Sequence, residues 1–296
     1  MQEASGGART RRYLMCPPSY FDVAYSINPW MDTARRPDRA RAIQQWQSLR
    51  DTLSAVGHRV EVAAPAPSLP DMVFAANAAV VLDGKVLVAT FRHPQRAGES
   101  ARFEAWFRDR GFRRVRRAAS VNEGEGDHLL ASGVLLAGNG PRTAPSANAE
   151  TQEYLGHPVL GLTLVDPRFY HLDTALAVLD TDDVMYWPGA FSPSSLRRLH
   201  RLFPDALEAS EDDAAVFGMN AISDGRNVIL PAAAHALAGK LAARGYLPRP
   251  VDVTELGKAG GGPKCCVLEL RGAPAPPDGP TDRPTPTARL RPEGAG

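Results

Sequence analysis

Hydrophobic and polar positions recur in a fixed order four times between residues 77 and 253. Each unit contains two short apolar runs joined by a tight turn, then a helical segment, then another short apolar run. The turns LDGK and SDGR contain Asp-Gly pairs, which favour hairpins with two-residue loops. A unit of this size cannot bury its own apolar face, so the repetition predicts ββαβ modules that pack against one another.

A fifth module is predicted to form from the two ends of the chain. The N-terminal part supplies strands at 11–16 and 58–63 and a helix over about 38–56, and residues 265–270 supply the remaining strand. Closure through the termini would remove the open sheet edges. We therefore expect an α/β fold, a five-bladed ββαβ propeller with pseudo-fivefold symmetry. The alternative, a doubly wound sheet, would lack a hairpin in every unit.

The repeat spans one predicted catalytic domain, residues 11–271, because no linker interrupts it. Residues 1–10 are small and polar. Residues 272–296 are rich in proline and glycine and lack an apolar period. Both ends are therefore expected to be disordered.

Composition excludes several classes of protein. The chain is 44% hydrophobic, enough for a sizeable core, and its net charge of +1 gives no reason to expect nucleic acid or an anionic membrane as a partner. The N-terminus lacks a signal-peptide apolar region, and no apolar run approaches the length of a membrane span. Three cysteines without a CxxC pair argue against a disulfide framework and a structural zinc site. These features favour a soluble, cytoplasmic protein without a membrane partner.

One polar residue stands at the same place in each unit, directly before or at the start of its first strand. These residues are Asn77, Asp127, His171, Asn220 and Cys265, at intervals of 50, 44, 49 and 45 residues. If the same corner of each module faces a common centre, a thiol, an imidazole and carboxylates meet there. Such a combination is typical of catalytic sites.

Cys265 is the candidate nucleophile. The glycines of GGGPK precede it and allow a ligand to approach the backbone closely, and Lys264 supplies positive charge that favours a thiolate. Cys266 would point to the opposite face if the segment is a strand. We therefore expect Cys265 rather than Cys266 to face the centre.

Carboxylates accompany the candidate histidine. Asp173 follows His171 by two residues and would lie on the same side of an extended segment, where it could bind a cationic substrate. Glu125 and Asp127 alternate in EGEGD, so an extended backbone would place both on one face. Two carboxylates in one pocket need a cation, and a planar guanidinium is the natural complement.

Six motifs together resemble the amidinotransferase, or pentein, superfamily of guanidine-modifying enzymes. They are NPWM at Asn28, FAANA at Asn77, FRHPQR ending at Arg96, EGEGD, FYHLDT and GGGPKC. The resemblance covers about residues 11–271 and implies a five-bladed propeller, in agreement with the repeat. It also implies a cysteine-dependent attack on a guanidino carbon through a covalent S-alkylthiouronium intermediate, without a metal or cofactor.

The resemblance assigns roles residue by residue. Cys265 would attack, His171 would transfer protons, and the acids Glu125, Asp127 and Asp173 would hold the guanidinium. Asn28 and Asn77 match asparagines of the arginine dihydrolases, whereas deiminases and dimethylarginine hydrolases usually have aspartate at the position of Asn77. Arg96 is the candidate contact for the substrate α-carboxylate, with Arg142 and Arg168 as further candidates.

Several substrates fit this resemblance, and the partner expected in each case is a small guanidino compound. The asparagine pattern favours hydrolysis of arginine to ornithine, ammonia and CO₂. The alternatives are a dimethylarginine dimethylaminohydrolase, which gives citrulline and dimethylamine, an amidinotransferase, and a non-catalytic binding module. A zinc hydrolase would favour HExxH spacing, which the sequence lacks. The oligomeric state stays open, and a homo-oligomer is compatible with the sequence.

Overall fold

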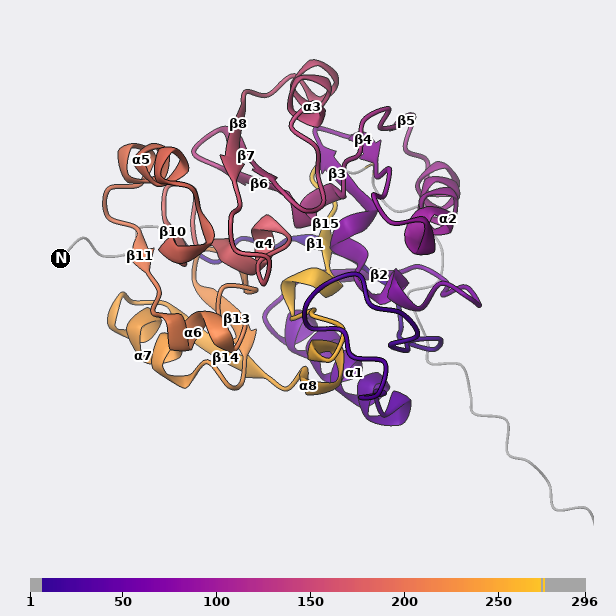
Figure 1. The fold of residues 1–296 in the computed structure, drawn as a ribbon, viewed down its shortest axis with the longest axis horizontal. Helices are drawn as coiled ribbons and strands as arrows, with labels where there is room; N and C mark the ends of the chain where they lie inside the picture. The colour runs from indigo at the N-terminus through magenta and orange to yellow at the C-terminus, as the bar shows by residue number, and fades with distance from the viewer. Residues whose placement is uncertain (1–6, 273, 275–296) are drawn as a thin grey trace, which may run out of the picture.

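The strands form a ring of small sheets. The structure, a computed structural model, describes residues 7–272 and residue 274, and within them the strands make five three-stranded sheets. Each sheet contains one antiparallel and one parallel pair of strands, and in four of the sheets the antiparallel pair is a hairpin. Figure 1 shows the sheets arranged around a centre, with α1, α2, α3, α5 and α7 on the outside. The predicted five-bladed α/β propeller is confirmed.

Four units follow one another along the chain. The first contains β3 (Ala79–Leu82), β4 (Lys85–Val88), α2 (Ala97–Asp109) and β5 (Arg114–Arg117). The second contains β6 (His128–Ala131), β7 (Val134–Asn139), α3 (Ala147–Leu155) and β8 (Val159–Thr163). The third contains α4 (Leu172–Ala175), β9 (Leu176–Val178), β10 (Val184–Tyr186), α5 (Pro193–Leu202) and β11 (Leu207–Glu208). The fourth contains α6 (Glu211–Ala215), β12 (Ile222–Ser223), β13 (Asn227–Pro231), α7 (His235–Ala243), β14 (Leu247–Val251) and α8 (Thr254–Gly257).

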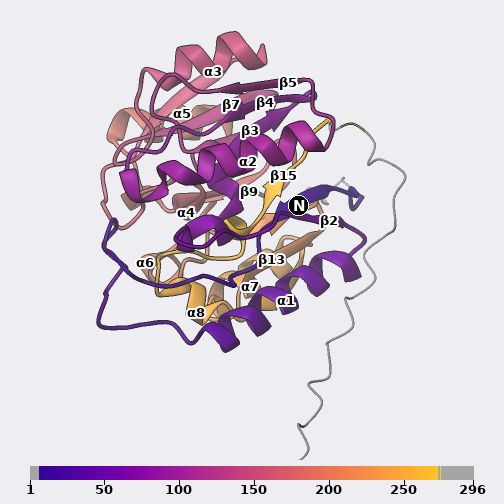
Figure 2. The same ribbon diagram turned by 90° about the vertical axis from the view of Figure 1, so that its right-hand side faces the viewer.

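The fifth sheet joins the two ends of the chain, as the sequence predicts. Its strands are β1 (Arg12–Met15), β2 (Arg59–Val62) and β15 (Leu268–Glu269), and α1 (Arg39–Ala55) connects the first two. β1 lies in the middle, antiparallel to β15 and parallel to β2. Figure 2 shows the yellow β15 beside the indigo N-terminal part of the chain. The ring is therefore closed by backbone hydrogen bonds between residues more than 250 positions apart.

Tight turns set the register of the hairpins. Asp83 and Gly84 both have positive φ, 51° and 70°, and so do Ser132 and Gly133, 50° and 74°. Two successive left-handed residues match the twist of the flanking strands. The Asp-Gly signal therefore identifies the β3–β4 hairpin correctly, and the weaker Ser-Gly signal identifies the β6–β7 hairpin.

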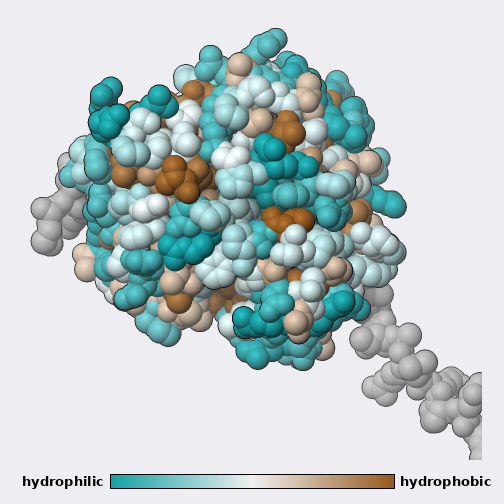
Figure 3. Space-filling model, in the orientation of Figure 1, coloured by the Kyte–Doolittle hydropathy of each residue, from teal (hydrophilic) through white to brown (hydrophobic). Residues whose placement is uncertain are grey.

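The first strands of the units surround the axis of the ring. β3 contacts β15, β6 contacts β9, and β9 contacts β12. Apolar side chains fill the space between the sheets and the outer helices, as Phe103 and Phe107 of α2 and Leu49 and Leu53 of α1 illustrate. None of the described helices has the length and apolar character needed to cross a membrane. On the face in Figure 3, hydrophobic residues form small patches separated by hydrophilic ones.

The predicted disordered ends lie largely outside the described residues, which omit 1–6, 273 and 275–296. Within the described part of the N-terminal segment, the amide of Arg9 donates a hydrogen bond to the carbonyl of Asp224.

Candidate functional site

The five polar residues that mark the repeat are all buried. Asn77, Asp127, His171, Asn220 and Cys265 have at most 2% of their surface exposed. Asn77 and Cys265 lie within the short helical turns Ala75–Ala78 and Lys264–Cys266, whereas Asp127 directly follows the turn Gly124–Gly126 and His171 directly precedes α4. These turns lie at the end of the ring where the first strands begin, and hydrogen bonds link several of them to one another.

The thiol of Cys265 lies between an amide and a carboxyl group. Asn220 Nδ2 is 3.1 Å from Sγ, and Asn220 Oδ1 accepts a hydrogen bond from the amide of Cys265. Asp173 Oδ2 is 3.5 Å from Sγ, whereas Asp173 Oδ1 is buried without a partner among the described residues. Burial, and then the charge of Asp173, raise the pKa of the thiol well above its usual value. The thiol is therefore protonated at neutral pH when no substrate is bound.

Burial also raises the pKa of Asp173, to about 7. A cation beside Asp173 and Cys265 would favour the ionised form of both groups. The unpartnered Oδ1 is available to such a cation. Asp173 belongs to the helical turn α4, not to the extended segment expected from the sequence, and its carboxyl group lies beside the thiol.

His171 contacts a glutamate that the sequence analysis missed. Its Nε2 is 2.8 Å from Glu123 Oε2, and Arg142 Nη1 lies 2.8 Å from the same oxygen. Burial lowers the pKa of His171 to about 4, against the opposing effect of Glu123. Although burial alone would raise the pKa of Glu123, the hydrogen bond from His171 and the charge of Arg142 lower it. His171 is therefore neutral, with its proton on Nε2, next to an ionised carboxylate.

Asn77 lies on the other side of the imidazole. Its Nδ2 is 3.5 Å from His171 Nδ1 and 3.3 Å from the carbonyl of Glu123, and its Oδ1 accepts a hydrogen bond of 2.9 Å from Arg96. Since Arg96 can only donate, it fixes the orientation of the amide and turns the NH₂ group toward His171.

Arg96 is not placed as expected for a residue that binds a substrate carboxylate. It is 3% exposed, and two hydrogen bonds of 2.8 Å join it to Glu99. It also donates hydrogen bonds to Asn77 and to the carbonyl of Asp71, and its guanidinium lies over the ring of Phe91 at 4.6 Å. The guanidinium is thus engaged by the protein itself, and its contribution to the site passes through Asn77.

Cys265, Asp173, His171, Glu123 and Asn77 form a cluster of buried polar groups. Glu125 is turned away from this cluster, contrary to the prediction. Its carboxylate accepts hydrogen bonds from Lys264 Nζ at 3.1 Å and from the amide of Glu269 at 2.8 Å, and it forms an ion pair with Arg271. The prediction assumed an extended backbone, but Gly124–Gly126 forms a 3₁₀ turn. Successive side chains of such a turn diverge by about 120° instead of alternating.

The glycines of EGEGD allow this turn to pack against the turn that carries Asn77. Gly124 has a φ of 65°, and a Cβ there would lie 2.8 Å from the carbonyl oxygen of Ala76. A Cβ on Gly126 would lie 2.2 Å from Asn77 Nδ2. The close approach brings Glu123 and Asn77 to opposite sides of His171.

Asp127 lies near the imidazole but bonds elsewhere. Thr143 Oγ1 donates to Oδ2 at 2.6 Å, the amide of Leu172 donates to Oδ1 at 3.0 Å, and His171 Nε2 is 3.9 Å from Oδ2. Burial raises the pKa of Asp127 well above its usual value. Asp127 therefore ties the start of β6 to α4, next to His171.

The loop before α1 closes over the cluster. Asn28 Nδ2 donates to the carbonyl of Ala259, its Oδ1 accepts from the amide of Trp30, and the Trp30 indole donates to the carbonyl of Arg168. Arg142 Nη2 donates to the carbonyl of Ile27. Asn28 thus fixes the shape of the loop, and Arg142 links the loop to Glu123.

Of the two further candidate arginines, only Arg142 lies in the cluster. It is 2% exposed and stacks over the ring of Tyr170 at 4.7 Å. Arg168 lies at the surface, where it pairs with Asp166 and Glu211. The structure therefore places Arg142 in the cluster and Arg168 at the surface, a difference that the sequence does not show.

A five-unit α/β ring with a buried thiol, imidazole and acids at its centre defines the class of the pentein hydrolases. No protein-family model matches the chain. It is 50% identical to a dimethylarginine dimethylaminohydrolase of Mycobacterium tuberculosis, over 88% of this chain and 86% of that protein. It is 37% identical to the bifunctional arginine dihydrolase/ornithine cyclodeaminase ArgZ of Synechocystis, over 88% of this chain but only 37% of that longer protein.

A solved structure agrees with these comparisons. The N-terminal domain of ArgZ, a cyanobacterial arginine dihydrolase crystallised with its substrate, superposes with a TM-score of 0.85 at 36% identity, over 88% of this chain and 98% of that one. The chain therefore belongs to the pentein superfamily, as a hydrolase of amidine C–N bonds of the dimethylarginine dimethylaminohydrolase and arginine dihydrolase type.

Proposed function

We propose that this protein hydrolyses Nω-methylated arginine to citrulline and releases the methylated amine. The observation that carries the proposal is the 50% identity to a dimethylarginine dimethylaminohydrolase over most of both chains. This comparison favours the alternative from the sequence analysis over its main hypothesis, hydrolysis of arginine to ornithine. Both reactions begin with attack on the same guanidino carbon.

The chemistry begins with binding of the guanidinium between the thiol and the imidazole. Asp173 Oδ2 lies 3.5 Å from the thiol, and the bound cation lowers the pKa of Cys265 so that the thiolate forms. The thiol proton passes to His171, the thiolate attacks the central carbon, and the C–N bond to the methylated amine breaks as the His171 imidazolium delivers that proton to the leaving amine. The product of this step is an S-alkylthiouronium.

Water completes the reaction. His171 removes one proton from the water molecule and the oxygen adds to the same carbon. The C–S bond then breaks, and the second water proton passes to the leaving sulfur, which gives the ureido product and the Cys265 thiol. Glu123 stabilises the imidazolium whenever His171 carries the second proton, because it is ionised and only 2.8 Å from Nε2. The sequence analysis did not consider Glu123, and it expected Glu125 to help hold the guanidinium.

Direct product analysis tests the proposal. Purified protein is incubated separately with arginine, monomethylarginine and asymmetric dimethylarginine, and citrulline, ornithine, ammonia and methylamines are quantified by mass spectrometry. Citrulline and dimethylamine in equal amounts from asymmetric dimethylarginine are expected. Turnover of arginine alone would contradict the proposal.

Asn77 supports the arginine dihydrolase as a second candidate. Its NH₂ group faces His171, and a neutral amide suits a neutral ureido group better than a carboxylate does. If citrulline undergoes a second hydrolysis to ornithine, ammonia and CO₂, Asn77 is positioned to orient it.

The Asn77→Asp variant tests this second candidate. If the second candidate is correct, the ratio of ornithine to citrulline formed from arginine should fall by about tenfold or more, since the loss of one positioned hydrogen bond costs about 1.4 kcal/mol or more. Mass spectrometry of the products gives the ratio. Asn148→Asp, the same change in an amide that bonds only to Asn139, is the matched control. An unchanged ratio in Asn77→Asp would remove the role of Asn77.

Activity is expected to decline below about pH 7. Because the pKa of Asp173 is raised to about 7, its carboxyl group becomes protonated and neutral as the pH falls through that value, and it then binds a guanidinium poorly. kcat/KM should fall about tenfold per unit below this point. Initial rates from pH 5 to 9 measure the profile. Asp173→Asn should be less active and lack this decline, whereas a decline only near pH 4 would assign it to His171 instead.

A further inference from the structure

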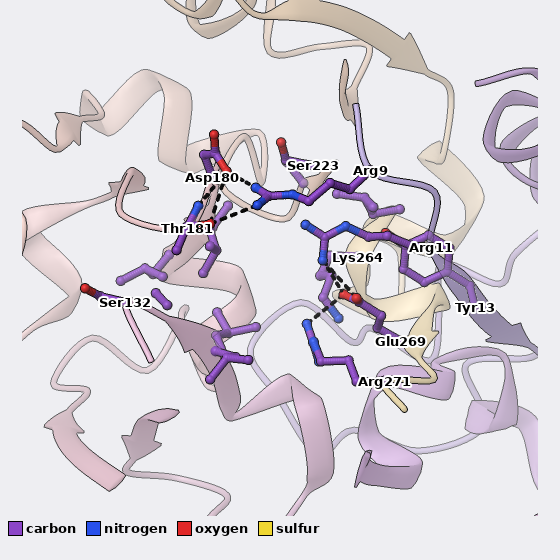
Figure 4. Close-up of a pocket in the computed structure, with 18 of the residues that line it drawn as sticks. Arg9, Arg11, Tyr13, Ser132, Asp180, Thr181, Ser223, Lys264, Glu269 and Arg271 are labelled. Atoms are coloured by element: carbon purple, nitrogen blue, oxygen red, sulfur yellow. Dashed lines mark hydrogen bonds and ion pairs between the residues drawn. The ribbon is translucent and has the colours of Figure 1, made fainter. Parts of the chain in front are cut away.

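A cavity opens at one end of the ring axis, opposite the cluster of Cys265 and His171. That cluster lies where the first strands begin. The cavity lies where β6, β9 and β12 run into their hairpin turns, near Ser132, Thr181 and Ser223. Its volume is about 390 Å³, within the range of small-molecule sites. Figure 4 shows side chains from these turns, from the N-terminal segment and from β15 around it.

Basic side chains concentrate on one wall of this cavity. Four cations line it, namely Arg9, Arg11, Lys264 and Arg271. Among the described residues, they pair with three carboxylates, Asp180, Glu269 and Glu125. The wall therefore carries one positive charge more than its acids neutralise.

Arg11 supplies the clearest unsatisfied donor. Its Nη1 lies 2.8 and 2.9 Å from the two oxygens of Glu269, but its Nε is buried without a hydrogen-bond partner among the described residues. A buried, unpartnered donor is costly unless a ligand or water accepts its hydrogen bond. The opposite wall is apolar and includes Leu129, Leu176 and Ile222.

We infer that this cavity binds a small organic anion, with its carboxylate or phosphate against Arg11 and its hydrocarbon part against the apolar wall. Guanidinium groups match the planar oxygens of carboxylate and phosphate. The volume admits a molecule of several carbon atoms. This site is separate from the one that binds the guanidino substrate.

The anion site is connected to the candidate nucleophile through one residue. Lys264 lines the cavity, and Cys265 follows it in the same 3₁₀ turn. Lys264 Nζ is held by Glu125 at 3.1 Å and by the carbonyl of Val267 at 3.2 Å. An anion competes with Glu125 for Lys264 and Arg271, so its binding shifts the turn that positions the thiol and changes kcat.

Isothermal titration calorimetry with two probes, inorganic phosphate and succinate, tests the binding site. Saturable binding of at least one probe is expected, and the stronger probe distinguishes phosphate from carboxylate ligands. Arg11→Gln removes the central cation, and Thr10→Glu adds a negative charge at the exposed rim without disturbing a buried contact. Each variant should weaken binding about tenfold. Arg50→Gln, which removes a surface charge on α1, should leave it unchanged.

The outcomes separate this proposal from anion binding at the central site. The expected binding persists when the guanidino substrate is saturating, and kcat changes as the probe saturates its site. Failure of both probes to bind, or binding that is displaced by substrate and insensitive to Arg11→Gln and Thr10→Glu, would overturn the site. Binding without a change in kcat would overturn its connection to Cys265.

Discussion

The Cys265→Ser variant is expected to lose on the order of 10⁴-fold or more in kcat, the scale seen when a nucleophile is removed. A serine hydroxyl remains protonated under conditions in which substrate binding ionises the thiol, so the covalent step fails. The change is nearly isosteric, and the contacts of Sγ with Asn220 and Asp173 can be retained by the hydroxyl. The variant should therefore still fold and bind substrate, which calorimetry with asymmetric dimethylarginine measures.

Cys266→Ser is the matched control for the nucleophile. Cys266 is adjacent and fully buried, and it belongs to the same helical turn. Its replacement should lower the free energy of unfolding modestly, because burying a hydroxyl in an apolar site is unfavourable. kcat should stay within about tenfold of the wild type, because Cys266 takes no part in the reaction. Mass spectrometry of the wild type quenched during turnover should detect the covalent adduct on the peptide that contains both cysteines, and Cys265→Ser should lack it. Comparable losses in both variants, or an adduct that persists in Cys265→Ser, would assign the nucleophile to Cys266.

The ring could be predicted because each unit carries local signals for its own elements. Asp83-Gly84 requires left-handed backbone conformations that few other residue pairs adopt, and the spacing of the polar sites repeats the unit length. The closure of the ring by both termini could be predicted because the segments outside the four complete units supply the strands and the helix of a fifth unit. These inferences depend on backbone preferences and periodicity, both of which are encoded locally.

The directions of individual side chains could not be predicted in the same way. Cys265, His171 and Asp127 were located because they occupy equivalent places in the repeat. Glu125 was misplaced because the residues before the first strands form short helical turns instead of extended segments. Glu123 and Asp127 are four residues apart, a spacing that places both near the imidazole once the backbone turns, and this spacing was the signal available in the sequence.

The role of Arg96 depended on tertiary contacts. Its partner Glu99 is only three residues away, but the hydrogen bond to Asn77 exists only because the chain folds back over 19 residues. A sequence shows that an arginine is present but not whether its donors are already occupied. An arginine with four hydrogen bonds to the protein and 3% exposure has a structural role, here the orientation of an amide.

The comparison of Glu123→Gln with Glu125→Gln tests most directly which of the two carboxylates supports catalysis. Glu123→Gln is expected to lower kcat by about 10²- to 10³-fold, the usual range for disturbed proton transfer. An amide cannot stabilise the imidazolium of His171 as an ionised carboxylate does, so the pKa of His171 falls further and the protonated form becomes less accessible. Loss of the charge also leaves Arg142 without its ion-pair partner, which should cost about 3–5 kcal/mol of stability.

Glu125→Gln makes the same chemical change two residues away, in a carboxylate that is equally buried and ion-paired. A similar loss of stability is expected, but with kcat within about tenfold of the wild type, because Glu125 contacts Lys264 and Arg271 instead of His171. Thermal unfolding and steady-state kinetics of both variants give the two quantities. Since stability should change alike in the two proteins, a difference in kcat cannot arise from unfolding, and it isolates the carboxylate that acts on the imidazole. Equal losses of kcat, or a larger loss in Glu125→Gln, would mean that the 2.8 Å contact between Glu123 and His171 is not the one that supports catalysis.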